Sequence, residues 1–232
     1  MGNQEKKMRE RHFLEAFLKH SNQTFENIVD HEGPDFILER DGIRLGVEVT
    51  LVYRDEGPVG SLLKKNESQS EGFLQRLADA YYLSGGLPLS LMTNFSAWPT
   101  TKDIPRLVEK LKANYPEVGA AEREVEVDDT GTYYLRALPD RFGDYKVWQC
   151  ANVSVGWVGV LEKGSIESRI ASKARKLSAY RRCVETNHLL IVINQMRGSG
   201  MVNLPDTLGK LDGCGFDEVH VFTYPHESRR VA

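Results

Sequence analysis

An Asp-Gly pair at residues 41 and 42 separates two runs of alternating apolar residues. This pattern is the strongest short-range signal for a β-hairpin that is closed by a two-residue type I′ turn. The turn also fixes the register, because Arg40 and Ile43 must flank it as a pair and Glu39 must then face Arg44. Residues 34–53 are therefore predicted to form a hairpin whose strands pair in a defined register.

The register assigns the side chains of this hairpin to two faces. The apolar face carries Phe36, Leu38, Leu45, Val47, Val49 and Leu51. The other face carries Asp35, Glu48 and Thr50, with the two carboxylates directly opposite each other and their Cβ atoms about 4.5–5.5 Å apart. Such a pair persists if a cation bridges it, if one carboxylate is protonated, or if both are solvated. A bridging cation indicates Mg²⁺ or Mn²⁺, which prefer oxygen ligands, whereas an exposed sheet face indicates solvation.

Pro34-Asp35, a hairpin and then Glu48-x-Thr50 resemble the motif of the PD-(D/E)XK nuclease superfamily, whose fold is that of restriction endonucleases. The resemblance implies that Asp35, Glu48 and the main-chain carbonyl of Val49 hold Mg²⁺ or Mn²⁺. The family usually has a lysine two residues after the glutamate. This chain has Thr50 at that position, and threonine cannot supply the positive charge.

Residues from about 5 to 20 are predicted to form a helix whose apolar stripe contains Phe13, Leu14, Phe17 and Leu18. Glu10 falls near the middle of this stripe, where a carboxylate is unfavourable unless it is paired or functional. The alternative places Glu10 in a frayed first turn, where a negative charge suits the helix dipole. The resemblance implies that a glutamate of the first helix contributes to the metal site. Glu10 is the first candidate and Glu15 is the second, or reserve, candidate.

Residues 25–30 are predicted to form a strand, and residues 54–164 an elaboration within a single domain that spans residues 1–232. The elements expected in this elaboration are a helix over 71–83, a strand over 89–95, a helix over 102–113 capped by Thr100 or Thr101, and strands over 123–127, 133–138 and 145–160.

A helix is predicted from Ser165, as its N-cap, to about Arg182. Residues 163–182 hold seven basic residues and one acid, which is the only strong basic patch in the chain. This patch is either a solvated helical face or a contact for the phosphate backbone of a nucleic acid. If it binds nucleic acid, the residues expected to contact the phosphates are Lys176, Arg169, Arg175 and Arg181. Lys173 lies about 50° from the centre of the inward stripe, closer than Lys176.

The remaining elements are a buried strand over 188–194, a short helix over 204–211, a last strand over 216–224 and a loose tail. The order matches the αβββαβ core of the PD-(D/E)XK family, which predicts an α/β (α+β) fold with a central mixed sheet flanked by helices. Ile166-x3-Ile170-x2-Lys173-x2-Lys176-x3-Tyr180 also resembles uncharacterised bacterial members with Glu-x-Thr. In relatives without the usual lysine, a helix-borne lysine takes its place, which implies a catalytic role for Lys173.

The net charge of −3 gives no global basic footprint, and no apolar run approaches the ~18 residues of a membrane span. Three cysteines without a close pair indicate reduced thiols in a cytoplasmic protein. The chain lacks the Gly-x-Ser-x-Gly elbow, the phosphate-binding Gly-Lys-Ser/Thr loop and the dinucleotide-binding glycine motif.

The resemblance therefore implies a metal-dependent nuclease in which Asp35, Glu48, Lys173, Glu10 and Thr50 form the catalytic site. Its expected partner is nucleic acid, with DNA preferred to RNA, and no membrane partner is expected. A homodimer is a further expectation, because homodimers are common among nucleases of this fold. One alternative is a nuclease fold that has lost catalysis and binds nucleic acid or a protein. Another is a structural or regulatory protein whose two carboxylates are simply exposed.

Overall fold

The hairpin around Asp41 and Gly42 forms with the predicted turn and register in the computed structural model. Asp41 and Gly42 have φ angles of 52° and 74°, and positive values at both positions are what a type I′ turn requires. Arg40 pairs with Ile43, and the guanidinium of Arg44 lies 3.4 Å from the carboxylate of Glu39. The local turn chemistry therefore sets the strand pairing, as expected.

The structure describes residues 3–55, 57, 60–151 and 158–232, and its contacts divide the chain into two units. The first unit comprises Met1–Leu63 with Trp157–Ala232, and the second comprises Lys64–Gly156. The hairpin belongs to the first unit, which therefore contains the predicted site.

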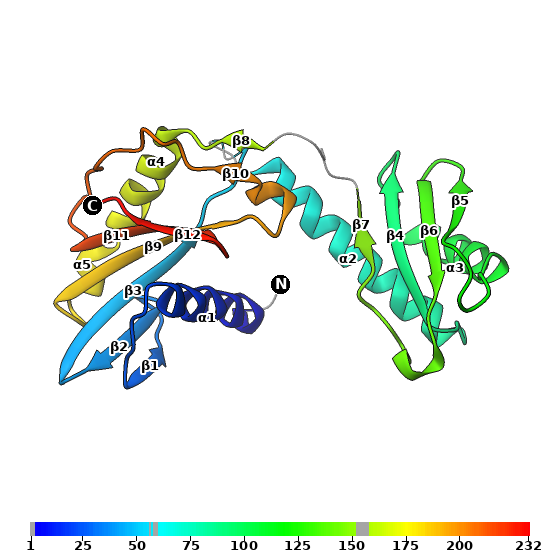
Figure 1. Cartoon of the computed structure of the whole chain (residues 1–232), viewed down its shortest axis with the longest axis horizontal. Coiled ribbons are helices and arrows are strands. Elements are labelled where there is room, and N and C mark those ends of the chain that lie inside the picture. Colours follow the sequence, from blue (N-terminus) through cyan, green and yellow to red (C-terminus); the bar gives the residue numbers. More distant parts are fainter. Residues whose placement is uncertain (1–2, 56, 58–59, 152–157) are drawn as a thin grey trace. The chain divides into compact units, whose positions relative to one another are not determined.

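The first unit contains a six-stranded mixed sheet in the order β1-β2-β3-β9-β11-β12 (Figure 1). Its strands are β1 (Asn27–Asp30), β2 (Phe36–Arg40), β3 (Ile43–Leu51), β9 (Thr186–Asn194), β11 (Glu218–Tyr224) and β12 (Glu227–Arg230). The central strands β3, β9 and β11 run parallel to one another, and the outer strands pair antiparallel. The predicted mixed α/β class is confirmed at this level.

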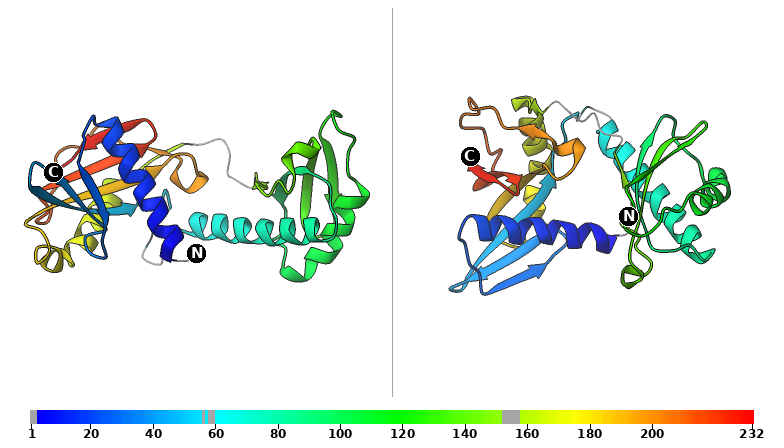
Figure 2. Two further views of the ribbon diagram at one scale, coloured as in Figure 1. Left: turned by 90° about the horizontal axis from the view of Figure 1, so that it is seen from below. Right: turned by 45° about the vertical axis from the view of Figure 1, so that its right-hand side comes forward.

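Helix α1 (Asn3–His20) covers one face of this sheet, which Figure 2 shows with the helix in front of the strands. Its predicted stripe packs against the apolar face of the hairpin and against Leu190, Val192 and Phe222. Helices α4 (Lys163–Ala174) and α5 (Leu177–Tyr180) pack on the other face, against alternate residues of β9 and β11. Alternate side chains of one strand therefore point to opposite faces of the sheet, toward α1 on one face and toward α4 and α5 on the other.

Three predictions for the second half of the chain are wrong. The helix expected from Ser165 to Arg182 begins at Lys163 and is interrupted at Arg175 and Lys176, with Glu162 as its N-cap residue. Residues 204–211 form turns and loop, although Leu204 and Leu208 are buried. The tail is ordered, because β12 pairs with β11 and Val231 enters the core. In each case packing against the sheet outweighs the local sequence pattern.

The second unit contains a four-stranded sheet in the order β5-β6-β4-β7. Its main elements are α2 (Leu62–Leu83, which begins in the first unit), β4 (Leu89–Phe95), α3 (Ile104–Ala113), β5 (Arg123–Val127), β6 (Gly131–Ala137) and β7 (Gln149–Cys150). Helices α2 and α3 pack on one face of the sheet through one apolar cluster. None of the described helices is long and apolar enough to span a membrane.

The remaining short elements are the 3-10 helices η1 (Thr101–Asp103), η2 (Asp140–Phe142) and η3 (Gly198–Gly200), and the paired strands β8 (Gly159–Val160) and β10 (Val202–Asn203). The long strand predicted for 145–160 is wrong where the structure describes it, because only β7 and β8 are extended there, and residues 152–157 lie outside the described residues. Helix α2 begins nine residues before the predicted Glu71.

Candidate active site

Glu48 lies in the middle of the sheet, on β3 between β2 and β9, and only 5% of its side chain is exposed. Its neighbours Val47 and Val49 pack toward α1, so the pleat directs Glu48 to the face that carries α4 and α5. Lys173 of α4 reaches it there, with its Nζ atom 2.6 Å from Oε1 of Glu48. The predicted helix-borne lysine and the predicted metal ligand are therefore in direct contact.

Asp35 is fixed just before the first residue of β2. Its Oδ2 atom accepts a hydrogen bond of 2.9 Å from the main-chain N–H of Val49. Pro34, the preceding residue, packs closely on Gly46, because a Cβ atom on Gly46 would lie 2.6 Å from Cγ of Pro34. The absence of a side chain at position 46 thus allows the chain to approach β3 and places the Asp35 carboxylate beside Glu48.

Lys7 of α1 holds the same loop from the other side. Its Nζ atom donates hydrogen bonds of 2.7 Å to the carbonyl oxygens of His31 and Asp35 and lies 3.7 Å from Oδ1 of Asp35. The first helix and the hairpin are therefore joined at Asp35 by one ammonium group, which also places a positive charge next to the carboxylate.

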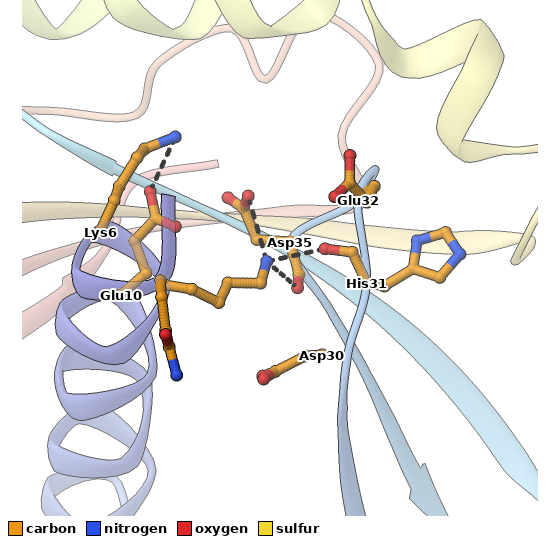
Figure 3. Close-up of a pocket in the computed structure, with 8 residues that line it drawn as sticks. Lys6, Glu10, Asp30, His31, Glu32 and Asp35 are labelled. Atoms are coloured by element: carbon orange, nitrogen blue, oxygen red, sulfur yellow. Dashed lines mark hydrogen bonds and ion pairs between the residues drawn. The ribbon is translucent and has the colours of Figure 1, made fainter. Parts of the chain in front are cut away.

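Glu10 of α1 lies near Asp35 but is not a contact of Glu48. Figure 3 shows Glu10 and Asp35 on the walls of one pocket of about 550 Å³, with Lys6 next to Glu10. The alternative that Glu10 lies in a frayed first turn is wrong, because α1 begins at Asn3 and the Glu10 residue is only 4% exposed. The reserve residue, Glu15, points away from this pocket and forms an exposed ion pair with Arg11.

Asp35 therefore influences two other carboxylates, that of Glu10 on α1 and that of Glu48 on β3. Burial raises the pKa of Glu48, and the negative charge of Asp35 raises it further, whereas Lys173 and a hydrogen bond from Tyr180 act in the opposite direction. Burial and Asp35 likewise raise the pKa of Glu10 against the influence of Lys6. A region with these properties favours the binding of a cation.

Replacing Asp35 by asparagine is expected to lower the pKa of both Glu10 and Glu48, because each loses a neighbouring negative charge. The amide oxygen of asparagine can still accept the hydrogen bond from Val49. Carboxyl ¹³C NMR titration would measure both values. As a control, replacing the exposed Asp41 by asparagine should leave them in place, and unchanged values in the Asp35 variant would contradict the shared electrostatic region.

Thr50 is buried on β3 and lies on the same face as Glu48, two residues further along. Among the proposed nucleic-acid contacts, Arg169 is half-buried, and its burial lowers its pKa. Arg175 and Lys176 are exposed at the break between α4 and α5. Arg181 is exposed and donates a hydrogen bond of 2.6 Å to the carbonyl of Gly215.

Sequence reasoning gave no role at the site to three side chains, namely Lys6, Lys7 and Tyr180. The helical period could have indicated the two lysines, because they precede Glu10 by four and three residues and thus share its face. Tyr180 ends α5, beyond the break at Arg175 and Lys176, so the helical period gave no signal for it. Burial strongly raises the pKa of Tyr180, and the adjacent charge of Glu48 raises it further.

A second cluster lies on the α1 face of the sheet, and sequence reasoning missed it entirely. Among the residues that the structure describes, one set of three histidine and carboxylate side chains has its ligand atoms within 4.8 Å of one another, namely His188, Glu218 and His220. The spacing Glu218-x-His220 in a strand was the available signal, since residues two apart share a face. Asp35, Glu48 and Glu10 do not form a set that compact.

Comparison with protein-family models, with curated proteins and with solved structures finds no match for the chain.

Proposed function

We propose that the protein is a metal-dependent phosphodiesterase that acts on nucleic acid. The observation that carries this proposal is the contact of 2.6 Å between Lys173 of α4 and the buried Glu48 of β3, next to Asp35. An acid on β3, a second acid just before β2 and a lysine in contact with the first are the groups that a metal-assisted hydrolase needs.

The donor atoms suit a hard divalent cation. Asp35 and Glu48 supply carboxylate oxygens and Val49 a main-chain carbonyl oxygen, which are the ligands preferred by Mg²⁺ and Mn²⁺. Burial and mutual repulsion disfavour two negative charges at this position, and a divalent cation relieves both effects. When bound, the cation would polarise a phosphate oxygen and make a water molecule more acidic.

The residues of the chain have separate roles in this proposal. Lys173 orients the attacking water and stabilises the negative charge that develops on phosphorus. Glu10 faces the pocket with a raised pKa, which suits it to hold a water molecule or to accept a proton. Thr50 can form only hydrogen bonds with water or substrate, and Lys173 therefore supplies the charge that the usual lysine would bring.

The order of the elements in the first unit supports a restriction endonuclease-like core. Helix α1, strands β1, β2 and β3, helix α4 and strand β9 follow one another, and the strands lie in the sheet order β1-β2-β3-β9. The exposed basic residues Arg175, Lys176 and Arg181 are the phosphate contacts that we propose for the nucleic acid, together with the half-buried Arg169.

A second candidate is a nuclease fold that binds nucleic acid without cleaving it. The observation that favours it is the ion pair itself, because Lys173 already neutralises Glu48 and competes with a metal for the same oxygen. The two candidates differ in whether a divalent cation displaces this lysine.

Calorimetric titration of Mn²⁺ into the wild type should show one site that disappears in Glu48→Ala. Glu15→Ala is the matched control, because it removes an exposed glutamate of α1 and should leave the binding intact. Cleavage of single-stranded and double-stranded DNA and RNA should then require Mn²⁺ or Mg²⁺. If the wild type neither binds Mn²⁺ nor cleaves any of these substrates in its presence, catalysis by this site is refuted.

A further inference from the structure

The cluster of His188, Glu218 and His220 is separate from the proposed nuclease site. His188 lies on β9 and pairs directly with Glu218 of the parallel strand β11, and His220 follows two residues later. The ring centroids of His220 and Phe17 of α1 are 5.1 Å apart, so the cluster lies on the α1 face. Glu48 points to the opposite face of the same sheet, where it meets Lys173.

The potential ligand atoms of the cluster lie within 4.8 Å of one another. Oε2 of Glu218 lies 2.8 Å from Nε2 of His220 and 3.8 Å from Nδ1 of His188. The other oxygen of Glu218, Oε1, lies 2.5 Å from Nη1 of Arg230. The backbone of Arg230 pairs with His220 across β11 and β12, and its Nε atom donates a hydrogen bond of 3.1 Å to the carbonyl of Ala232. Arg230 therefore orients the carboxylate so that Oε2 faces both imidazole rings, as hydrogen-bonded partners behind metal ligands commonly do.

We propose that His188, Glu218 and His220 bind Zn²⁺ or a similar transition-metal ion. Two imidazole nitrogens and one carboxylate oxygen form a ligand set that suits such ions better than Mg²⁺. The ligands come from the beginnings of two adjacent parallel strands, so the strand pairing fixes the spacing of their backbones. Three protein ligands leave a fourth position of a tetrahedral ion free for water or an anion.

The site is accessible to an ion from solution. Between 14% and 27% of each of the three side chains is exposed. His188 also lines a groove of about 380 Å³ whose other walls include Phe25, Arg40 and Leu45. This groove offers room for the fourth ligand, and the guanidinium of Arg40 favours an anionic one.

Titration of Zn²⁺ in competition with a chromophoric chelator tests the proposal. The wild type is expected to bind one equivalent of Zn²⁺. His220→Gln and Glu218→Gln should each weaken this binding by more than about 100-fold. Loss of a residue that only forms a hydrogen bond with a metal ligand has a smaller effect, roughly 10–100-fold. His226→Gln is the matched control, because His226 is exposed in the turn between β11 and β12. Circular dichroism would show that each variant is folded.

Co²⁺ provides a second measurement, because its visible absorption reports the number and geometry of its ligands. A band that appears in the wild type and in His226→Gln, but not in His220→Gln, would support the site. The proposal is overturned if Zn²⁺ binds as tightly to His220→Gln as to the wild type, or if the wild type does not bind it. Glu48→Ala separates the two metal sites, because it should lose Mn²⁺ and keep Zn²⁺, and loss of Zn²⁺ there would also overturn the proposal.

Discussion

Substitution of Lys173 by alanine is expected to reduce metal-dependent cleavage of nucleic acid by about 10²–10³-fold, the effect of removing one group that stabilises transition-state charge. Binding of Mn²⁺ should become tighter in the same variant, because Glu48 loses the cation that lies 2.6 Å from its Oε1 atom. Single-turnover cleavage rates and calorimetry measure the two effects separately. Opposite changes in these quantities would assign Lys173 to the chemical step.

The control for this experiment is Lys176→Ala. Lys176 lies at the break between α4 and α5, is exposed and has the same charge as Lys173. Its loss should weaken substrate binding slightly and leave the chemical step unchanged, since a phosphate contact acts on affinity. Equal rate losses in the two variants would contradict a specific role for Lys173 and favour a general contribution of the basic patch.

The site could be predicted from the sequence where its geometry follows from local rules. The Asp-Gly turn fixed the register that places Asp35 and Glu48 together, and the helical period identified Lys173 as closer to the core than Lys176. These inferences needed no knowledge of distant parts of the chain. The helical period placed Glu10 in the apolar stripe but left a frayed first turn open, and the burial of Glu10 in α1 decides between the two.

The remaining features depend on contacts between distant segments, which a single sequence does not reveal. Strand β12 has no apolar alternation and forms because β11 offers it an edge. Helix α4 ends at Ala174 although the basic pattern continues, and the chain turns so that Tyr180 reaches Glu48. The cluster around Glu218 requires that β9 and β11 be adjacent, which is a property of the sheet order rather than of either strand.

Lys173→Met is expected to destabilise the protein by about 3 kcal/mol at pH 8, because removing one partner of a buried ion pair leaves an uncompensated charge. The side chains of Lys173 and Glu48 are 19% and 5% exposed. Lys163→Met is the control on the same helix, since Lys163 pairs with Glu167 at the exposed surface, and it should change the free energy of unfolding by less than about 1 kcal/mol. Urea unfolding measures both variants.

The loss of stability caused by Lys173→Met should depend on pH in a defined direction. Burial and Asp35 already raise the pKa of Glu48 in the folded protein, and removal of Lys173 raises it further. Between the unfolded and the folded pKa of Glu48, the folded variant holds a proton on Glu48 that the unfolded chain has released. The stability of the variant relative to the wild type therefore falls as the pH rises above the ordinary range of a carboxylate. At pH 4 most of the deficit should disappear, because Glu48 is protonated there.

Glu48→Gln combined with Lys173→Met should recover most of the lost stability at pH 8, since a buried ion pair that is replaced as a whole leaves no unpaired charge. A double variant that is as unstable as Lys173→Met alone would show that the methylene groups of Lys173, and not its charge, stabilise α4 on the sheet. Recovery of stability without recovery of cleavage would separate the structural role of Lys173 from its catalytic role. The amide introduced at position 48 cannot hold the metal as a carboxylate does, and it does not restore the missing positive charge.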